Sequence, residues 1–422
     1  MKRVVVTGMG IWSCIGQDLQ TVTNSLKQGK SGIVFDARCI EYGLQSGLIG
    51  DVPSPNLKPY LVRKLRATMS EDAEYAYMAA RQAFEQAGIS EEYLSQNEVG
   101  VIFGNDGNGH VTEYHKIMEE EHNSLMLGPN ALFRAETSSV TMNMNSIFHL
   151  RGINLTIGSA CASGSHAIGY AKLLISMGLQ KMILVGGSCG IDLKGAAGAD
   201  GLSALSVRND NPTRASRPFD KDRDGMIPSG GAAALVLEEY EHAVARRATI
   251  LAEVCGYGFS SNGIEEISMP CADAEYIAMK RALDDAGLQP SDIDYVNAHA
   301  TSTIAGDIEE AKALTRLFVG SSISSASRAS RASSLSSPFI SSTKSMTGHE
   351  NWMAGASEAV YSILMMQNNF VAPNINLEHK IEEAADLNIV TETVYTPINT
   401  VLSNSSGMGG TNSALVLRKV ID

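Results

Sequence analysis

The stretch INLTIGSACASGSHAIGYAKLLISMGL, residues 153–179, decides the fold of this chain. It opens with alternating apolar residues at Ile153, Leu155 and Ile157, a pattern typical of a β-strand. A short turn over residues 158–160 leads into a run that is apolar on nearly every side, which predicts a buried helix. A strand followed directly by a buried helix favours an α/β architecture, in which helices cover a mostly buried sheet.

Cys161 lies where this strand becomes the helix. The first N–H groups of a helix have no intrahelical partner, and the positive end of the dipole favours a thiolate over a thiol. An isolated buried cysteine is more often an inert apolar residue. The position therefore makes Cys161 a candidate nucleophile whose role depends on what surrounds it.

The rest of the chain repeats the same plan. Apolar strands and helices alternate through the first half, and the second half contains helix, strand, helix and a terminal strand–glycine loop–strand. We predict two halves, residues 1–246 with the candidate nucleophile and residues 247–422, related by internal duplication. Residues 321–337, rich in serine, alanine and arginine, are predicted to form a surface insertion.

The composition is that of a globular protein, with 44% hydrophobic and 19% charged residues in a chain of 422. No apolar run reaches the roughly eighteen residues of a membrane helix, and the N-terminus lacks a signal cleavage site, so we expect a cytoplasmic protein that does not enter a membrane. The net charge of −13 argues against nucleic acid as a partner. Six scattered cysteines without a CxxC pair argue against a disulfide framework and a zinc site.

Two histidines stand out from the other seven by their sequence context. His299 follows the apolar end of a predicted strand in NAHATST, and His349 closes TKSMTGH before a second buried helix. With Cys161 they supply a nucleophile and two imidazoles, and Lys344 adds a positive charge nearby. The loop GMGGT, residues 407–411, lacks the lysine of a phosphate-binding loop; its backbone N–H groups are candidates for an oxyanion hole.

These motifs together resemble those of the β-ketoacyl-acyl-carrier-protein synthases, the condensing enzymes of the thiolase fold. The subtypes that the sequence resembles most are synthases I and II. The resemblance rests on five ordered segments: SACASG (159–164), RPFDKDRDG (217–225), NAHATST (297–303), KSMTGH (344–349) and SNSSGMGGTN (403–412). It implies a thiolase-like fold of two duplicated halves in five layers, α/β/α/β/α. It also implies a decarboxylating Claisen condensation that elongates an acyl chain in fatty-acid or related polyketide synthesis.

The resemblance assigns roles to individual residues. It implies that Cys161 takes the acyl chain, and that His299 and His349 bind the malonyl thioester carbonyl and promote loss of carbon dioxide. Lys344 would hold the histidine environment with Glu310 as its partner, supported by Asn404. The backbone N–H groups of Cys161 and Met408 would form the oxyanion hole, and Thr301 and Thr303 would bind the pantetheine arm.

The resemblance also implies partners and an ion site. The substrates arrive on acyl carrier protein, so no other cofactor is expected, and the family forms dimers, here a homodimer or a heterodimer with a related synthase. A basic patch for the acidic carrier is predicted at Arg63, Lys64, Arg66 and Arg134. A monovalent cation is predicted at Asn297, Glu358, Ser403 and Asn404.

Ser406 and Met408 stand where the family usually has two phenylalanines, one of which gates the acyl pocket. Loss of both rings should widen this gate, which suggests an unusual acyl substrate, such as a long, unsaturated or branched chain. Two other functions stay open: a non-catalytic chain-length factor, which usually lacks the cysteine, and a Cys-His hydrolase, which does not need two such histidines. The sequence leaves open the chain length and whether the pathway makes fatty acids or polyketides.

Overall fold

Ten strands of the described chain form one sheet in two topologically equivalent halves. The computed structural model describes residues 1–107, 109–320 and 337–420. The strand order is β10-β9-β13-β14-β8-β1-β7-β6-β4-β5. The N-terminal half contains β1 (Val4–Trp12), β4 (Gly100–Gly104), β5 (Asn154–Ile157), β6 (Met182–Cys189) and β7 (Gly231–Glu239). The C-terminal half contains β8 (Ala252–Ser261), β9 (Tyr295–Asn297), β10 (Phe339–Ser341), β13 (Thr400–Gly407) and β14 (Thr411–Arg418).

The two halves have the same pairing pattern. In the first, β5, β4 and β6 are parallel, and β7 and β1 continue the sheet antiparallel. In the second, β10, β9 and β13 are parallel, and β14 and β8 continue it antiparallel. The halves join through two residue pairs between β1 and β8, Val5 with Glu253 and Val6 with Ala252. The predicted duplication is therefore present in the topology.

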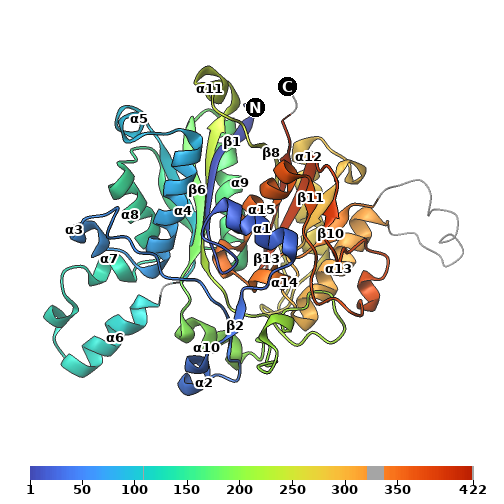
Figure 1. Cartoon of the computed structure of the whole chain (residues 1–422), viewed down its shortest axis with the longest axis horizontal. Coiled ribbons are helices and arrows are strands. Elements are labelled where there is room, and N and C mark those ends of the chain that lie inside the picture. The colour runs from blue at the N-terminus through green and yellow to red at the C-terminus, as the bar shows by residue number, and fades with distance from the viewer. Residues whose placement is uncertain (108, 321–336, 421–422) are drawn as a thin grey trace, which may run out of the picture.

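The helices complete five layers (Figure 1). α4 (Glu71–Ala87) and α8 (Ser139–Phe148) cover the outer face of the first half, and α12 (Ala272–Ala286) and α13 (Ile304–Phe318) cover that of the second. α9 (Ser163–Ser176) and α15 (Ala354–Asn368) lie between the halves and contribute to the central core. This is the predicted α/β/α/β/α arrangement.

The middle layer is close-packed because small residues face each other where α9 and α15 meet. A methyl group added to Gly355 would lie 2.6 Å from the backbone nitrogen of Ser165. One added to Gly164 would lie 2.9 Å from the nitrogen of Ala356. Glycine is thus required at both positions for the backbones to approach each other. Residues Ala354–Met366 of α15 are all buried, as its apolar sequence predicts.

The remaining elements are short or lie at the periphery. They are helices α1 (Leu19–Gln28), α2 (Ala37–Tyr42), α3 (Arg63–Arg66), α5 (Glu91–Gln96), α6 (His110–Glu121), α7 (Ala131–Ala135), α10 (Leu193–Gly201), α11 (Tyr240–Ala245) and α14 (Lys344–Thr347), with strand pairs β2 (Ile33–Phe35) with β3 (Leu48–Gly50) and β11 (Phe370–Val371) with β12 (Val394–Tyr395). No helix in the described ranges is long and apolar enough to cross a membrane.

The predicted domain boundary at 246/247 falls between α11 and β8. Whether the halves are separate domains stays a prediction. The serine-rich segment 321–337 lies, except for its last residue, outside the described residues. The strand predicted over residues 293–300 is shorter in the structure, where β9 ends at Asn297. Residues 298–300, which include His299, lie beyond the end of the strand.

Candidate active site

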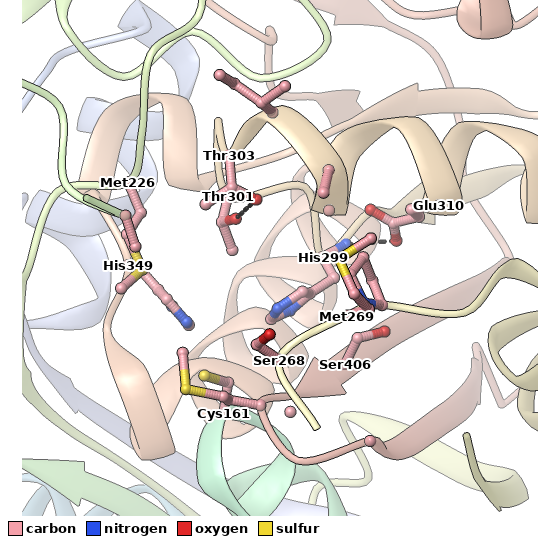
Figure 2. Close-up of a pocket in the computed structure, with 18 of the residues that line it drawn as sticks. Cys161, Met226, Ser268, Met269, His299, Thr301, Thr303, Glu310, His349 and Ser406 are labelled. Carbon is pink, nitrogen blue, oxygen red and sulfur yellow. Dashed lines mark hydrogen bonds between the residues drawn. The ribbon is translucent and has the colours of Figure 1, made fainter. Parts of the chain in front are cut away.

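Segments that follow three parallel strands bring the predicted reactive side chains together. β5 leads through the 3-10 turn Ala160–Ala162, which contains Cys161; β9 ends just before His299; and β10 is followed by α14 and His349. All three residues line one pocket of about 380 Å³. Figure 2 shows both imidazole rings projecting into the space beside Cys161. Because β5 and β10 are equivalent strands of the two halves, the nucleophile and one imidazole follow corresponding positions in the duplicated fold.

The turn that presents Cys161 has a left-handed residue immediately before it. Ala160 has φ +44°, a conformation that costs an alanine about 1–2 kcal/mol. Hydrogen bonds hold it: Ala160 N–H donates to Asp106 Oδ2 at 2.7 Å, and Ser163 Oγ donates to the Ala160 carbonyl at 2.6 Å. The turn places Cys161 in front of α9 rather than within it.

The acidity expected for Cys161 is not what the structure shows. Burial raises the pKa of the thiol above its ordinary value, against the opposing effects of the Met408 backbone N–H, the Lys344 charge and the cysteine's own N–H. The N–H groups at the helix terminus favour the thiolate, but removing its charge from water on burial has the larger effect on the pKa. The N–H groups of Cys161 and Met408, the two predicted for the oxyanion hole, are among the groups that lower the pKa of the thiol.

His299 and His349 are both buried and neutral at physiological pH. Their ring centroids lie 5.4 Å apart with the ring planes at 84°. Burial, together with the charge of Lys344, lowers the pKa of His349 to about 3. Burial, Lys344 and His349 lower the pKa of His299 well below its ordinary value. Each neutral ring carries one N–H that can donate to an oxygen without adding charge to the pocket.

The predicted pairing of Lys344 with Glu310 is wrong. The Lys344 ammonium, which is buried, donates to Glu358 Oε1 on α15. Glu310 instead accepts the backbone N–H groups of His299 at 2.7 Å and Ala300 at 2.6 Å. Its carboxylate is thus occupied in fixing the loop that carries His299. Asn404 supports it, donating from Nδ2 to Glu310 Oε1 at 2.8 Å.

The residues predicted to hold a cation have unpaired oxygen atoms. Each of these four residues has a buried oxygen that finds no hydrogen-bond partner in the described part of the chain: Asn297 Oδ1, Glu358 Oε2, Ser403 Oγ and Asn404 Oδ1. Asn297 and Ser403 are paired in register on adjacent strands, β9 and β13. Leaving such groups buried and unpaired costs about 1–3 kcal/mol each, more for a charged one, so the set fits an oxygen-ligated cation.

The residues predicted for the pantetheine arm and the gate line the same pocket. Thr301 and Thr303 are joined by a hydrogen bond between their hydroxyl groups, 3.0 Å long. Ser406 and Met408 lie on the glycine loop side, where Met408 is exposed. Figure 2 places Ser406 near Met269, and His349 on the other side of the view.

The predicted basic patch is not part of this pocket. Arg63 and Lys64 are exposed on α3, and Arg66 is half-buried there, with its Nε donating to the Leu61 carbonyl. Arg134 is half-buried on α7. Figure 1 shows α3 and α7 on the same side of the molecule, in the N-terminal half.

Some pocket and turn residues carried no signal in the sequence. Asp106 lies in a glycine-rich loop and was not singled out. Glu275 has the spacing of an ordinary acidic residue in the first turn of a helix, yet it is buried in the pocket wall. Only the fold distinguishes these residues from surface acids.

Comparisons with known proteins agree with the geometry. Residues 1–243 match the family model described as beta-ketoacyl synthase, N-terminal domain, and residues 251–378 match beta-ketoacyl synthase, C-terminal domain. The 3-oxoacyl-[acyl-carrier-protein] synthase 1 of Escherichia coli K12 is 39% identical over 426 residues, which cover 100% of both chains.

Solved structures show the same architecture. A beta-ketoacyl synthase from Burkholderia phymatum STM815 superposes with a TM-score of 0.91 at 36% identity, covering 100% of both chains. A type II polyketide ketosynthase, solved with its acyl-carrier protein and bound to a hexaketide, gives a TM-score of 0.86 at 29% identity, also over 100% of both chains.

Proposed function

The chain belongs to the β-ketoacyl synthase family, and from this membership we propose how its pocket performs the condensation and which partners serve it. It is a 3-oxoacyl-carrier-protein synthase, an acyltransferase that elongates acyl chains. The observation that carries the residue assignment is the meeting of Cys161, His299 and His349 in one pocket, which Met408 also lines.

In the first step Cys161 accepts the acyl chain. The thiolate attacks the thioester carbonyl, and the two backbone N–H groups stabilise the negative oxygen of the intermediate. The carrier's thiolate then leaves and takes up the proton that Cys161 gave up. Because burial raises the pKa of Cys161, the Lys344 charge and these N–H groups are needed to populate the thiolate.

In the second step the neutral histidines stabilise an enolate. The malonyl thioester loses carbon dioxide, and the electron pair of the broken carbon–carbon bond stays on the remaining fragment, which is an enolate. The enolate oxygen accepts hydrogen bonds from the ring N–H groups of His299 and His349. The enolate carbon attacks the acyl carbonyl on Cys161, and collapse of the intermediate expels the Cys161 thiolate. Neither of the two proposed steps uses a cofactor.

We assign the acyl carrier protein as the partner. The Thr301 and Thr303 hydroxyls suit the amides of a pantetheine arm, which alternate donors and acceptors. Arg63, Lys64, Arg66 and Arg134 suit an acidic carrier surface, where charge complementarity raises the association rate. The related ketosynthase solved with its carrier supports this assignment. We also propose a cytoplasmic enzyme.

We further propose a structural monovalent cation at Asn297, Glu358, Ser403 and Asn404. Their unpaired oxygen atoms are the ligands that a hard cation prefers. Bound there, the ion would supply positive charge behind the loops of His299 and the Lys344 pair.

A homodimer through β5 is the oligomer we propose. β5 ends the strand order. The carbonyl of Ile153, just before β5, accepts from Val101 N–H of β4, and the Ile157 carbonyl accepts from Asn105 N–H just after β4, which leaves the backbone of Asn154 and Thr156 facing the open edge. α8 packs on β5 and α7, and α7 has two exposed apolar side chains, those of Leu132 and Phe133. An open edge beside exposed apolar groups favours association.

The experiment is intact-protein and peptide mass spectrometry after incubation with acyl carrier substrates. The wild-type enzyme should carry the acyl mass on the peptide with Cys161, Cys161→Ser should lack that thioester, and Cys271→Ser should behave like wild type. His299→Ala and His349→Ala should still be acylated but release carbon dioxide from malonyl carrier protein roughly a hundredfold more slowly. Absence of any adduct in the wild type would favour the non-catalytic subunit; hydrolysis without carbon dioxide release would favour the hydrolase.

A further inference from the structure

The pocket wall contains a buried carboxyl group that the condensation does not use. Glu275, on α12, is 1% exposed and lines the same pocket as Cys161. Among the described residues its Oε2 has no hydrogen-bond partner. Burying a polar atom without a partner costs about 1–3 kcal/mol, so the position is one that a ligand atom would stabilise.

A second unpartnered group lies beside it. The Ser406 hydroxyl oxygen on β13 is also buried, and it has no partner that meets hydrogen-bond geometry among the described residues. It is near enough to Glu275 to lower the pKa of the carboxyl, but burial and the charge of Glu310 outweigh it and raise that pKa well above its ordinary value. This direction favours the protonated carboxyl, which has an O–H to donate and a carbonyl oxygen to accept.

Two other polar side chains that line the pocket, those of Asn412 and Asn262, are paired. Asn412 Nδ2 donates to Asn262 Oδ1 at 2.9 Å, and Asn262 Nδ2 donates to the Met269 carbonyl at 2.9 Å. These bonds tie the loop before α12 to the glycine loop and shape the wall. Glu275 and Ser406, by contrast, both have a buried oxygen with unused hydrogen-bonding capacity.

The small side chain at position 406 leaves room in this part of the pocket. A serine there occupies far less volume than the phenylalanine usual in the family, and the pocket lining extends past it to Met269, Pro270 and Glu275. Figure 2 shows Ser406 beneath Met269, on the opposite side of the view from His349. By contrast, apolar side chains around the same pocket are exposed: Leu202, Ile267, Ile304 and Met408. The pocket thus combines an apolar rim with a buried polar pair.

We propose that Glu275 and Ser406 form a polar subsite that binds a ketone or hydroxyl oxygen carried on the acyl chain of the substrate. The inference rests on the proposed function, because it concerns the chain that Cys161 accepts. A ketone oxygen would accept from both O–H groups, and a hydroxyl would also donate to Glu275. A saturated chain would leave both groups unpaired. The enzyme is thereby specific for partly oxygenated acyl chains.

The test compares acyl carrier substrates of one chain length: a fully saturated chain and chains with a ketone or hydroxyl at successive carbons. The readout is kcat/KM for elongation with malonyl carrier protein. The wild type should prefer at least one oxygenated chain by about tenfold or more, the effect of one buried hydrogen bond. Glu275→Leu, which keeps the size and removes the polar atoms, should lose that preference, and Glu275→Gln should retain part of it.

Controls separate the possible failures. Glu265→Leu makes the same change at an exposed position outside the pocket lining and should keep the wild-type preference ratio. Ser406→Ala, a minimal change, should reduce the ratio and serves if Glu275→Leu does not fold. Equal ratios in the wild type and the Glu275 variants would overturn the subsite while leaving the synthase assignment intact. Failure of every chain to acylate Cys161 would instead overturn the proposed function.

Discussion

At the scale of single residues, the reactivity of Cys161 results from two opposed effects. Burial disfavours the thiolate, while the Met408 N–H, its own N–H and Lys344 favour it, and burial is the larger effect. The enzyme therefore keeps most of its nucleophile protonated at rest. A protonated thiol resists oxidation and alkylation between turnovers, since the thiolate is the reactive form.

This balance predicts the pH dependence of alkylation. Below its pKa a thiol gains about tenfold in thiolate per pH unit, so the iodoacetamide rate at Cys161 should rise from neutral pH without levelling near the ordinary value of about 8.5. The rate is measured by mass spectrometry of the peptide that contains Cys161. A plateau near pH 7 would contradict the raised pKa.

The neutral histidines predict a second pH dependence. The rate of malonyl decarboxylation, which depends on neutral His299 and His349, should show no loss as the pH falls through 6.5.

Met408 permits a second test at the residue scale. It is exposed at the pocket, where the family usually has a gating phenylalanine. Met408→Phe should narrow the accepted range of acyl chains, because a rigid ring replaces a flexible thioether. Acylation rates across a panel of acyl carrier substrates measure this, with Met177→Phe on an exposed position outside the pocket as control. An unchanged profile would contradict the wider-gate hypothesis.

At the scale of elements, the contact between α9 and α15 fixes how close the Cys161 turn comes to the His349 loop. Gly355 and Gly164 let the two backbones meet, and α15 also supplies Glu358, the partner of Lys344. Motif order in the sequence identified Cys161, His299, His349 and Lys344, because each follows a recognisable strand. It did not determine which of two glutamates reaches Lys344, because that depends on how α13 and α15 are placed.

The glycine contact predicts opposite effects at two helical glycines. Gly355→Ala should lower the free energy of unfolding by about 1–3 kcal/mol, since the added methyl meets rigid backbone. Gly198→Ala, in α10 with open space around it, should raise it by about 0.5–1 kcal/mol by helix propensity. Urea denaturation of both variants measures the difference. Equal effects would mean that the α9–α15 contact relaxes freely.

At the scale of the whole molecule, the alternation of strands and helices predicted an α/β architecture with two duplicated halves, and the family resemblance implied the five layers. The repeated order of strand and buried helix has few other ways to bury its apolar faces. Glu275 and Asp106 could not be predicted, because the burial of Glu275 and the hydrogen bond from Ala160 to Asp106 both depend on segments distant in sequence. The prediction of an acidic Cys161 was wrong for a related reason, because the burial that raises its pKa is a property of the assembled pocket.

The open edge of the sheet predicts the oligomer. Asn154→Pro removes an N–H that faces away from β4, so it should block strand pairing with a second copy and shift the protein toward monomer. Asn154→Ala should remain dimeric. Light scattering coupled to size-exclusion chromatography gives the mass of each variant. A dimeric proline variant would place the interface elsewhere.

The seam between the halves has a consequence for folding. The nucleophile belongs to one half and both imidazoles to the other, while β1 and β8 share only two residue pairs across the sheet. Neither half, however well formed, contains a complete catalytic set. Recovery of condensation during refolding therefore reports the docking of the halves, and a spectroscopic signal from secondary structure can return before it does.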